Sequence, residues 1–241
     1  MVEMLWKFAA FSWIWVIVII LLVIIYFVYG MLDKYEKSGY KKVSGNGFFK
    51  TLFNLGVGGE FRTYYKLWQM GEKYILTNVY LPKEDNSTSE SDIIVINEYG
   101  IFVFESKNYS GFIYGGENSK TCTQSFGKFK KFKFLNPILQ NKGHIKSIDE
   151  YLDNKYTGKF YSFIVFSERC SLKKIKLSGK NVFVIKRNKL ESEYKKLLKR
   201  ETKKLSPSEV REIYAVLKTK SNVGEDIKKK HIENIQKKLN A

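Results

Sequence analysis

The stretch DIIVINEYGIFVFESK, residues 92–107, decides the fold of this chain. Two apolar runs, residues 93–96 and 101–104, flank a polar segment that ends in glycine. Short β-branched and aromatic runs around such a segment predict a β-hairpin. Both faces of both strands are otherwise apolar, so we expect the strands to be central in a sheet that is covered on two sides.

Three charged side chains stand at the open end of this predicted hairpin. Side chains alternate faces along a strand, so Glu105 and Lys107 share a face. A two-residue turn at residues 98–99 places Asp92 opposite Glu105, and a turn at 99–100 places it opposite Lys107, with paired Cβ atoms about 5 Å apart in either register. Two carboxylates at the end of a buried hairpin are costly unless their charge is compensated, and a divalent cation such as Mg²⁺ would compensate it. The alternative is a group of solvated charges at a strand end, with Lys107 neutralising one acid.

The composition sets bounds on partners and compartment. Lysine and arginine number 42 against 24 aspartates and glutamates, a formal net charge of +18. Such an excess favours a polyanionic partner, either nucleic acid or anionic lipid, although a lysine-rich proteome would also produce it. Cys122 and Cys170 form no CxxC pair, which argues against a disulfide framework and a zinc site. The two histidines, His144 and His231, leave little for imidazole chemistry, and we expect the soluble part to lie in a reducing cytoplasm.

An uncharged apolar segment covers residues 8–32. As a helix rising about 1.5 Å per residue it exceeds a hydrocarbon core of about 30 Å, which predicts a membrane span. Tryptophans toward one end and tyrosines toward the other are typical of interfacial anchoring. A signal peptide is the competing interpretation, but its apolar region would be shorter and no small-residue cleavage site follows the segment. Four lysines lie within ten residues after the segment and one precedes it, so the positive-inside rule places the N-terminus outside and the C-terminal domain in the cytoplasm.

The rest of the chain predicts an α/β fold. We expect a juxtamembrane linker over residues 33–51, a helix over 58–70, a strand over 74–81, a polar loop over 82–91, the hairpin, a strand over 112–114, a helix opened by Asn136 and Pro137, and strands over 161–166 and 181–185. This order indicates a mixed sheet flanked by helices. Residues 188–241 are expected to form a basic region of solvated packing helices, with capping boxes at Asn188 and Ser206 and with DNA or membrane contact as the second interpretation.

The segment 119–134 is basic, aromatic and poorly periodic. Such a segment suits contact with phosphates and stacking on bases. The equally weighted alternative is a solvated loop edge whose aromatic side chains turn inward. Its lysines are Lys128, Lys130, Lys131 and Lys133, and they alternate with Phe126, Phe129, Phe132 and Phe134.

Several motifs together resemble the nuclease-related domain, NERD, over about residues 52–167. They are Gly59-Glu60 at a helix start, Asp92 at a strand start, Glu105-Ser106-Lys107-Asn108-Tyr109 with Gly111, and Asn136-Pro137-Ile138-Leu139-Gln140-Asn141 with His144. That family is similar to the PD-(D/E)xK nuclease superfamily. The resemblance therefore implies a restriction-endonuclease-like core over residues 52–187 and metal-assisted hydrolysis of phosphodiester bonds in nucleic acid, with DNA as the first interpretation and RNA as the alternative.

The resemblance also implies a role for each matching residue. Asp92 and Glu105 would hold Mg²⁺, with Mn²⁺ as a substitute. Lys107 would position the attacking water and stabilise charge on the phosphate. Glu60 would reach the same site as an additional acid, and Gln140 would orient a ligand or water.

The sequence departs from the superfamily pattern at Ser91, which stands where proline precedes the first acid. This departure bears on local strand packing more than on the metal site. Two hypotheses compete with a membrane-tethered nuclease: a non-catalytic nucleic-acid-binding module of the same fold, and a membrane-associated scaffold. We expect no small-molecule cofactor.

Overall fold

The computed structural model describes residues 2–83, 87–128, 130–221 and 223–240. The chain divides into two compact units, Met1–Gly39 and Tyr40–Ala241. The first unit is mainly one helix, α1 (Val2–Lys37). Its stretch Trp13–Lys37 contains an 18-residue window with a mean hydropathy of 2.9 and is long and apolar enough to cross a membrane, properties that a signal sequence near an N-terminus shares.

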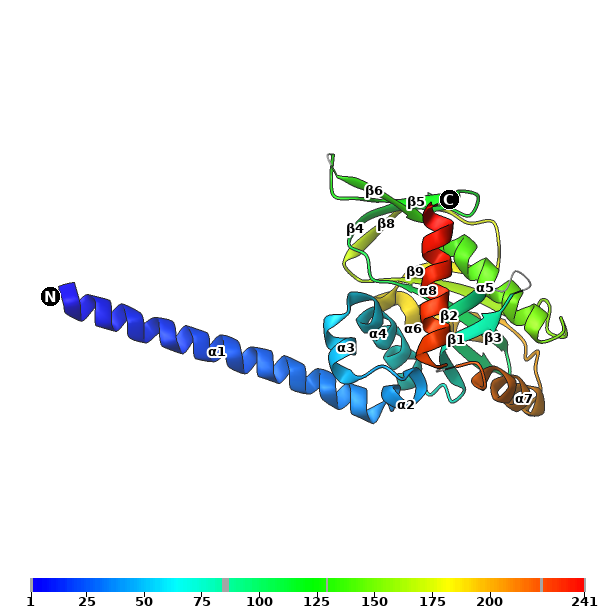
Figure 1. Ribbon diagram of the computed structural model, residues 1–241, viewed down its shortest axis with the longest axis horizontal. Coiled ribbons are helices and arrows are strands. Elements are labelled where there is room, and N and C mark those ends of the chain that lie inside the picture. Colours follow the sequence, from blue (N-terminus) through cyan, green and yellow to red (C-terminus); the bar gives the residue numbers. More distant parts are fainter. Residues whose placement is uncertain (1, 84–86, 129, 222, 241) are drawn as a thin grey trace. The chain divides into compact units, whose positions relative to one another are not determined.

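A five-stranded mixed sheet forms the centre of the second unit (Figure 1). Its strands, in spatial order, are β1 (Ile75–Pro82), β2 (Thr88–Asn97), β3 (Gly100–Lys107), β7 (Phe160–Phe166) and β9 (Val182–Lys186). β1, β2 and β3 pair antiparallel, whereas β3, β7 and β9 pair parallel. β7 is buried throughout and β3 along its apolar run, as continuous apolar runs in a covered sheet require.

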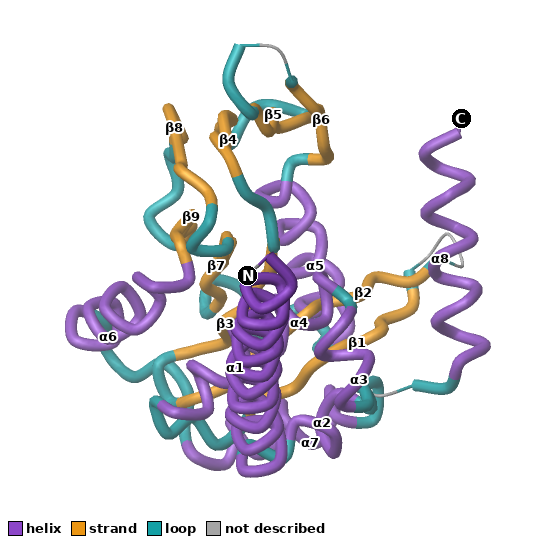
Figure 2. Tube along the Cα trace, turned by 90° about the vertical axis from the view of Figure 1, so that its left-hand side faces the viewer, coloured by secondary structure: helices purple, strands orange, loops and turns teal. Residues whose placement is uncertain are grey.

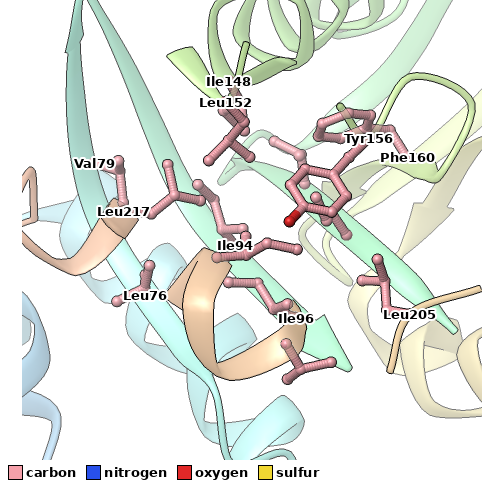
Figure 3. Close-up of a cluster of buried hydrophobic side chains, with 14 of the residues drawn as sticks. Leu76, Val79, Ile94, Ile96, Ile148, Leu152, Tyr156, Phe160, Leu205 and Leu217 are labelled. Carbon is pink, nitrogen blue, oxygen red and sulfur yellow. The ribbon is translucent and has the colours of Figure 1, made fainter. Parts of the chain in front are cut away.

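Helices cover both faces of this sheet. The helices of the unit are α2 (Tyr40–Ser44), α3 (Phe48–Phe53), α4 (Leu55–Gln69), α5 (Pro137–Tyr151), α6 (Leu190–Arg200), α7 (Pro207–Lys218) and α8 (Glu225–Asn240), with a 3-10 turn at Arg187–Lys189. α5 and α7 pack on one face, where Ile94, Ile148 and Leu217 belong to a single buried cluster (Figure 3). α4 and α6 pack on the other face, where the ring centroid of Tyr194 lies 5.0 Å from that of Phe102. α8 lies beside β2 (Figure 2).

A second, four-stranded sheet packs beyond the start of α5. Its order is β6 (Lys131–Leu135), β5 (Thr121–Ser125), β4 (Gly111–Gly116) and β8 (Cys170–Lys176). One face is buried in a cluster that joins Ile113 and Cys170 to Ile138 of α5 and Phe166 of β7. In both views this sheet stands apart from β1 and β2 (Figures 1 and 2). Cys122 and Cys170 are both buried and free.

The segment expected as a linker is mostly helical. α1 continues to Lys37, and α2 and α3 follow. The ring of Tyr40 is fully buried, with centroids 5.0 Å from Phe61 and 5.1 Å from Tyr64 of α4. Helices of five and six residues are not stable alone, so this packing rather than local propensity fixes them.

Strands replace two further expectations, and one strand lies where none was expected. The loop over 82–91 is shorter, because β2 begins at Thr88, and residues 84–86 lie outside the described residues. The segment 119–134 contains β5 and β6 rather than an irregular loop, with Phe129 outside the described residues. β8 was not expected at all. β6 and β8 carry exposed lysines and β5 is short and polar, which weakens the apolar pattern from which strands are predicted.

The two predicted capping boxes differ in outcome. Ser206 and Glu209 form the reciprocal pair at the start of α7. At the start of α6 the cap is Lys189, and no side chain there makes a capping hydrogen bond. Asn188 lies instead within the 3-10 turn, which supplies the bend between β9 and α6.

Candidate functional site

The β2–β3 hairpin has the first of the two predicted registers. Asn97 pairs with Gly100 and Ile93 with Phe104, so the turn is residues 98–99 and Asp92 stands opposite Glu105 where the ladder ends. Gly100 closes the turn with a φ of 146°, and a Cβ at this position would collide with the carbonyl oxygen of Lys159. The tight turn therefore fixes which charged residues face each other.

Where the hairpin ladder ends, the Asp92 carboxylate replaces the backbone acceptor that a paired strand would supply. Its Oδ2 atom accepts a hydrogen bond of 2.8 Å from the backbone N–H of Ser106. Burial, reinforced by the negative charges of Glu105 and Glu60, raises the pKa of Asp92 above its ordinary value. In the protein without a cation, this carboxylate is the least stabilised charge of the hairpin end.

Glu105 is only 3 % exposed and is held by two basic groups. The Lys107 ammonium lies 2.5 Å from Oε1, and Nε2 of His144 lies 3.3 Å from Oε2. Burial alone would raise the pKa of Glu105, but Lys107 and His144 outweigh it and lower that pKa to about 2. Burial by itself would lower the pKa of Lys107. The negative charges of Glu105 and Asp92 outweigh burial, so the pKa of Lys107 is raised overall. Glu105 and Lys107 are thus a fixed ion pair.

α5 brings two polar side chains to this ion pair. The helix begins at Asn136, whose side chain caps the N–H of Ile138, and Pro137 fits its first turn. Gln140 and His144 lie one turn apart on the same face of the helix. A hydrogen bond of 2.9 Å between Ser89 Oγ and His144 Nδ1 holds the imidazole from its other side. The ring therefore bridges β2 and Glu105.

One pocket collects these groups. Its volume is about 320 Å³, and it opens between the start of β2, the end of β3, α5 and α8. Its lining includes Asp92, Glu105, Lys107, Gln140 and His144. The described lining is completed by Lys83, Ser87, Thr88, Ser89, Glu90, His231 and Asn234. Four of the five predicted catalytic residues, Asp92, Glu105, Lys107 and Gln140, are therefore brought together.

Glu60, the fifth, approaches from α4, on the opposite face of the sheet. The hydroxyls of Thr63 in α4 and Ser106 in β3 lie 3.2 Å apart, whereas Glu105 and Lys107, the neighbours of Ser106, point to the α5 side. Glu60 is not among the pocket-lining residues. Burial, followed by the charges of Glu90 and Glu105, raises its pKa to about 7. Glu60 is therefore electrostatically coupled to the site without lining it.

A buried arginine holds the start of α4 in place. Arg187, 2 % exposed, donates from Nη1 to the Gly59 carbonyl oxygen at 2.9 Å. Its Nε and Nη2 atoms each lie 3.1 Å from a carboxylate oxygen of Glu168. Because the bidentate pair with Glu168 holds the Arg187 side chain, its hydrogen bond to Gly59 fixes the backbone immediately before Glu60.

The four lysines suggested for nucleic-acid contact lie elsewhere. Lys131 and Lys133 are on β6, and Lys128 and Lys130 are in the connection that precedes it. All four are exposed, and none lines the pocket.

Sequence reasoning missed both histidines as site residues. His144 could have been found, because it follows Gln140 by four positions and shares its helix face. His231 of α8 has no such local signal. Its Nδ1 atom lies 2.7 Å from Thr88 Oγ1, and its Nε2 atom lies 3.4 Å from Glu90. Glu90 also accepts a hydrogen bond from the Tyr80 hydroxyl.

The donor set fits a hard cation only in part. Asp92 and Glu105 offer carboxylate oxygens, the ligands that Mg²⁺ prefers. The buried Oε2 atom of Glu105 contacts Nε2 of His144 at 3.3 Å without a regular hydrogen bond. Against this, the described residues contain no group of three or more His, Cys, Asp or Glu side chains placed to hold a metal ion. The site therefore suits Mg²⁺ bound by two carboxylates, with water or phosphate oxygens completing its coordination.

A mixed sheet with helices on both faces and opposed carboxylates beside a lysine is consistent with a nuclease-like α/β protein. The comparisons with known proteins agree: a family model for the nuclease-related domain, NERD, matches residues 55–167. An uncharacterized protein of Bacillus anthracis is 36% identical over 167 residues, which cover 69% of this chain and 76% of the relative. The chain belongs to the nuclease-related domain family. No solved structure matches it.

Proposed function

We propose that this chain is a membrane-anchored, metal-dependent nuclease that hydrolyses phosphodiester bonds of nucleic acid, DNA in the first instance. The observation that carries the proposal is the meeting of Asp92, Glu105, Lys107 and Gln140 in one pocket, in a chain of the nuclease-related family. These are the groups that metal-assisted phosphodiester hydrolysis needs: carboxylates to hold a cation, and a positive charge to stabilise the phosphate.

Each side chain takes a role in this proposal. Asp92 and Glu105 would hold Mg²⁺, which when bound supplies charge neutralisation at the phosphate and lowers the pKa of water. Lys107 orients the Glu105 carboxylate through their ion pair and presents positive charge to the phosphate. Gln140 orients the phosphate or the attacking water by hydrogen bonds. His144, held by Ser89, keeps Glu105 in place from α5.

Glu60 is proposed as an additional acid that acts on the site through its charge. With a pKa raised to about 7, it can hold or release a proton near neutral pH. This is a modest role, because its side chain does not line the pocket.

The test is cleavage of plasmid and of labelled oligonucleotides by the full chain in detergent, with Mg²⁺, with Mn²⁺ and with EDTA. Asp92→Ala and Lys107→Ala should each lower the cleavage rate by about 10²–10³-fold, the usual effect of removing one electrostatic group from a phosphoryl or acyl transfer site. Asp153→Ala is the matched control, since Asp153 lies in an exposed turn and its side chain is 80% exposed. Equal cleavage by all four proteins would remove the assigned site. Calorimetric titration with Mn²⁺ provides a second measurement, in which Asp92→Ala should bind more weakly than wild type.

One observation favours a second function, a non-catalytic nucleic-acid-binding module. Lys107 already neutralises Glu105, and the described residues provide no three-ligand group of His, Cys, Asp or Glu. Such a module would bind nucleic acid in a salt-sensitive manner, without cleavage and with little effect of metal. The cleavage assay separates the two functions.

The membrane anchor is part of the proposal. Support comes from the apolar stretch Trp13–Lys37 and from the excess of lysines after it, which favours a single span with the C-terminal unit in the cytoplasm. The chain should remain in membranes washed with alkaline carbonate. Intact-mass measurement should show the whole N-terminal segment, since a signal sequence would have been cleaved.

A further inference from the structure

The outward face of the second sheet has a regular layout. Residues that pair directly across strands point to the same face. One row therefore runs Ser171, Phe112, Ser125, Lys131 across β8, β4, β5 and β6. The next row runs Lys173, Tyr114, Thr123, Lys133. Each row has an aromatic ring on β4 and a lysine on β6, at the edge of the sheet.

The two sides of β4 differ sharply in exposure. Phe112 and Tyr114 are 41% and 39% exposed, whereas Ile113, which lies between them and points inward, is 0% exposed. Lys131 and Lys133 are also exposed. An alternating strand whose outward positions are aromatic rather than polar calls for an explanation, because exposing such rings to water is unfavourable.

A β-bulge in β8 adds a further lysine to this face. Tyr114 of β4 pairs with Lys173 of β8, and Gly116 pairs with Lys176. Between these two pairs β4 therefore advances by two residues and β8 by three. The extra residue is accommodated at Lys174, whose φ of +51° lies in the left-handed region. Without the bulge Lys176 would point to the buried side; with it, Lys173 and Lys176 share the outward face. The ammonium of Lys173 lies 5.7 Å from the ring centroid of Phe112, which confirms that the two are on one side.

We propose that this face, defined by Phe112, Tyr114, Lys131, Lys133, Lys173 and Lys176, binds single-stranded nucleic acid. The two rings, about 7 Å apart along β4, provide flat surfaces on which unpaired bases stack. The lysines on β6 and β8 flank the rings on both sides and contact the phosphates. A duplex hides the flat sides of its bases, so the rings favour single strands.

This inference deepens the proposed nuclease function, because it names the form of substrate that the protein would hold. It also revises which residues of the segment 119–134 take part. Lys131 and Lys133 belong to the face with the β4 rings, whereas Phe132 and Phe134 point to its other side. The rings that stack are therefore outside that segment.

The experiment measures binding of a fluorescent oligothymidylate and of a matched duplex to the full chain in detergent. EDTA is present throughout, so hydrolysis plays no part and failure of the nuclease proposal would not affect the result. Tyr114→Ala and Phe112→Ala should each weaken single-strand binding about tenfold, and Tyr114→Phe should restore it. Thermal unfolding of each variant, measured in parallel, separates lost binding from lost folding.

The lysines are tested by their salt dependence. The double variant Lys131→Gln/Lys133→Gln should reduce the slope of log affinity against log salt by about 0.7 for each lysine. Lys196→Gln/Lys199→Gln, the same charge change on the exposed side of α6, should leave affinity and slope unchanged. The proposal is overturned if the ring variants bind as wild type does, if duplex binds as tightly as single strand, or if the α6 control loses as much as the β6 variant.

Discussion

The two sheets of the second unit treat their charged and aromatic residues in opposite ways. At the open end of the β2–β3 hairpin the charged groups are buried or half-buried, so they must satisfy one another: Glu105 is held between Lys107 and His144. On β4 and β6 the rings and lysines face water and are available to a partner. Burial produces a fixed constellation suited to chemistry, while exposure leaves a surface suited to binding. If both proposals hold, hydrolysis takes place at the first sheet and the single strand is held at the second.

The largest expected effect concerns the two sides of β4. Ile113→Ala should lower the free energy of unfolding by about 2–5 kcal/mol, because it leaves a cavity beneath the second sheet. Tyr114→Ala, one residue away on the exposed side, should cost less than about 1 kcal/mol. Chemical denaturation of the full chain in detergent measures both. Similar costs for the two variants would show that the outward face is packed against something, which would break the contrast between the sheets.

A smaller effect is expected at the buried ion pair. In EDTA, Lys107→Met should lower the free energy of unfolding by about 2 kcal/mol, because it leaves Glu105 and Asp92 without their counter-charge. Added Mn²⁺ should raise the melting temperature of this variant more than that of wild type, since a cation can replace the lost charge.

Lys203→Met is the matched control for that experiment. Lys203 pairs with Glu98 at 2.9 Å, but their side chains are 58% and 38% exposed, and such surface pairs contribute little. If the two lysine variants lost equal stability, or if Mn²⁺ had no effect on Lys107→Met, the hairpin end would be an ordinary solvated charge group.

The smallest expected effect is a pH dependence set by Glu60. Burial, then the charges of Glu90 and Glu105, raises its pKa from the ordinary 4.5 to about 7 in the folded protein. The native state therefore binds more protons than the unfolded state between these values, and this group lowers stability as the pH rises through that range. Without metal, the stability of Glu60→Gln relative to wild type should rise by about 1 kcal/mol for each pH unit between about pH 5 and pH 7 and level off above about pH 8.

The control for the titration is Glu150→Gln, at the exposed end of α5, which should show no such change in relative stability. A flat difference between Glu60→Gln and wild type across the range would mean that Glu60 is solvated in the protein. It would then have no electrostatic link to the hairpin end.

The sequence predicts the central sheet well because burial there is two-sided. The hairpin, its turn and the strand at Phe160–Phe166 follow from continuous apolar runs, and α5 follows from Asn136 and Pro137 at its start. Four site residues follow from the register and from the family resemblance. The resemblance was needed for Gln140, since no local pattern marks a lone glutamine.

Apart from β4, the strands of the second sheet escape prediction for the converse reason. Lysines at outward positions of β6 and β8 dilute the alternation that would reveal these strands, and β5 is short and polar. α2 and α3 escape because Tyr40 packs against residues about 20 positions later, which no local window contains. His231 escapes because its partners, Thr88 and Glu90, are distant in sequence. For Tyr40 and His231, the residues that determine the local structure are distant in sequence and become neighbours only in the folded chain.

The hydrogen bond between Thr88 and His231 joins residues 143 positions apart, and it has a consequence for the acid four residues along the same strand. Thr88 and Ser89 open β2 and are each tied to a histidine, one from the last helix of the chain and one from α5. A shift of either helix would pull on the strand that carries Asp92. Shortening the protein at its carboxyl end would thus disturb the alignment of a carboxylate that the removed residues never touch.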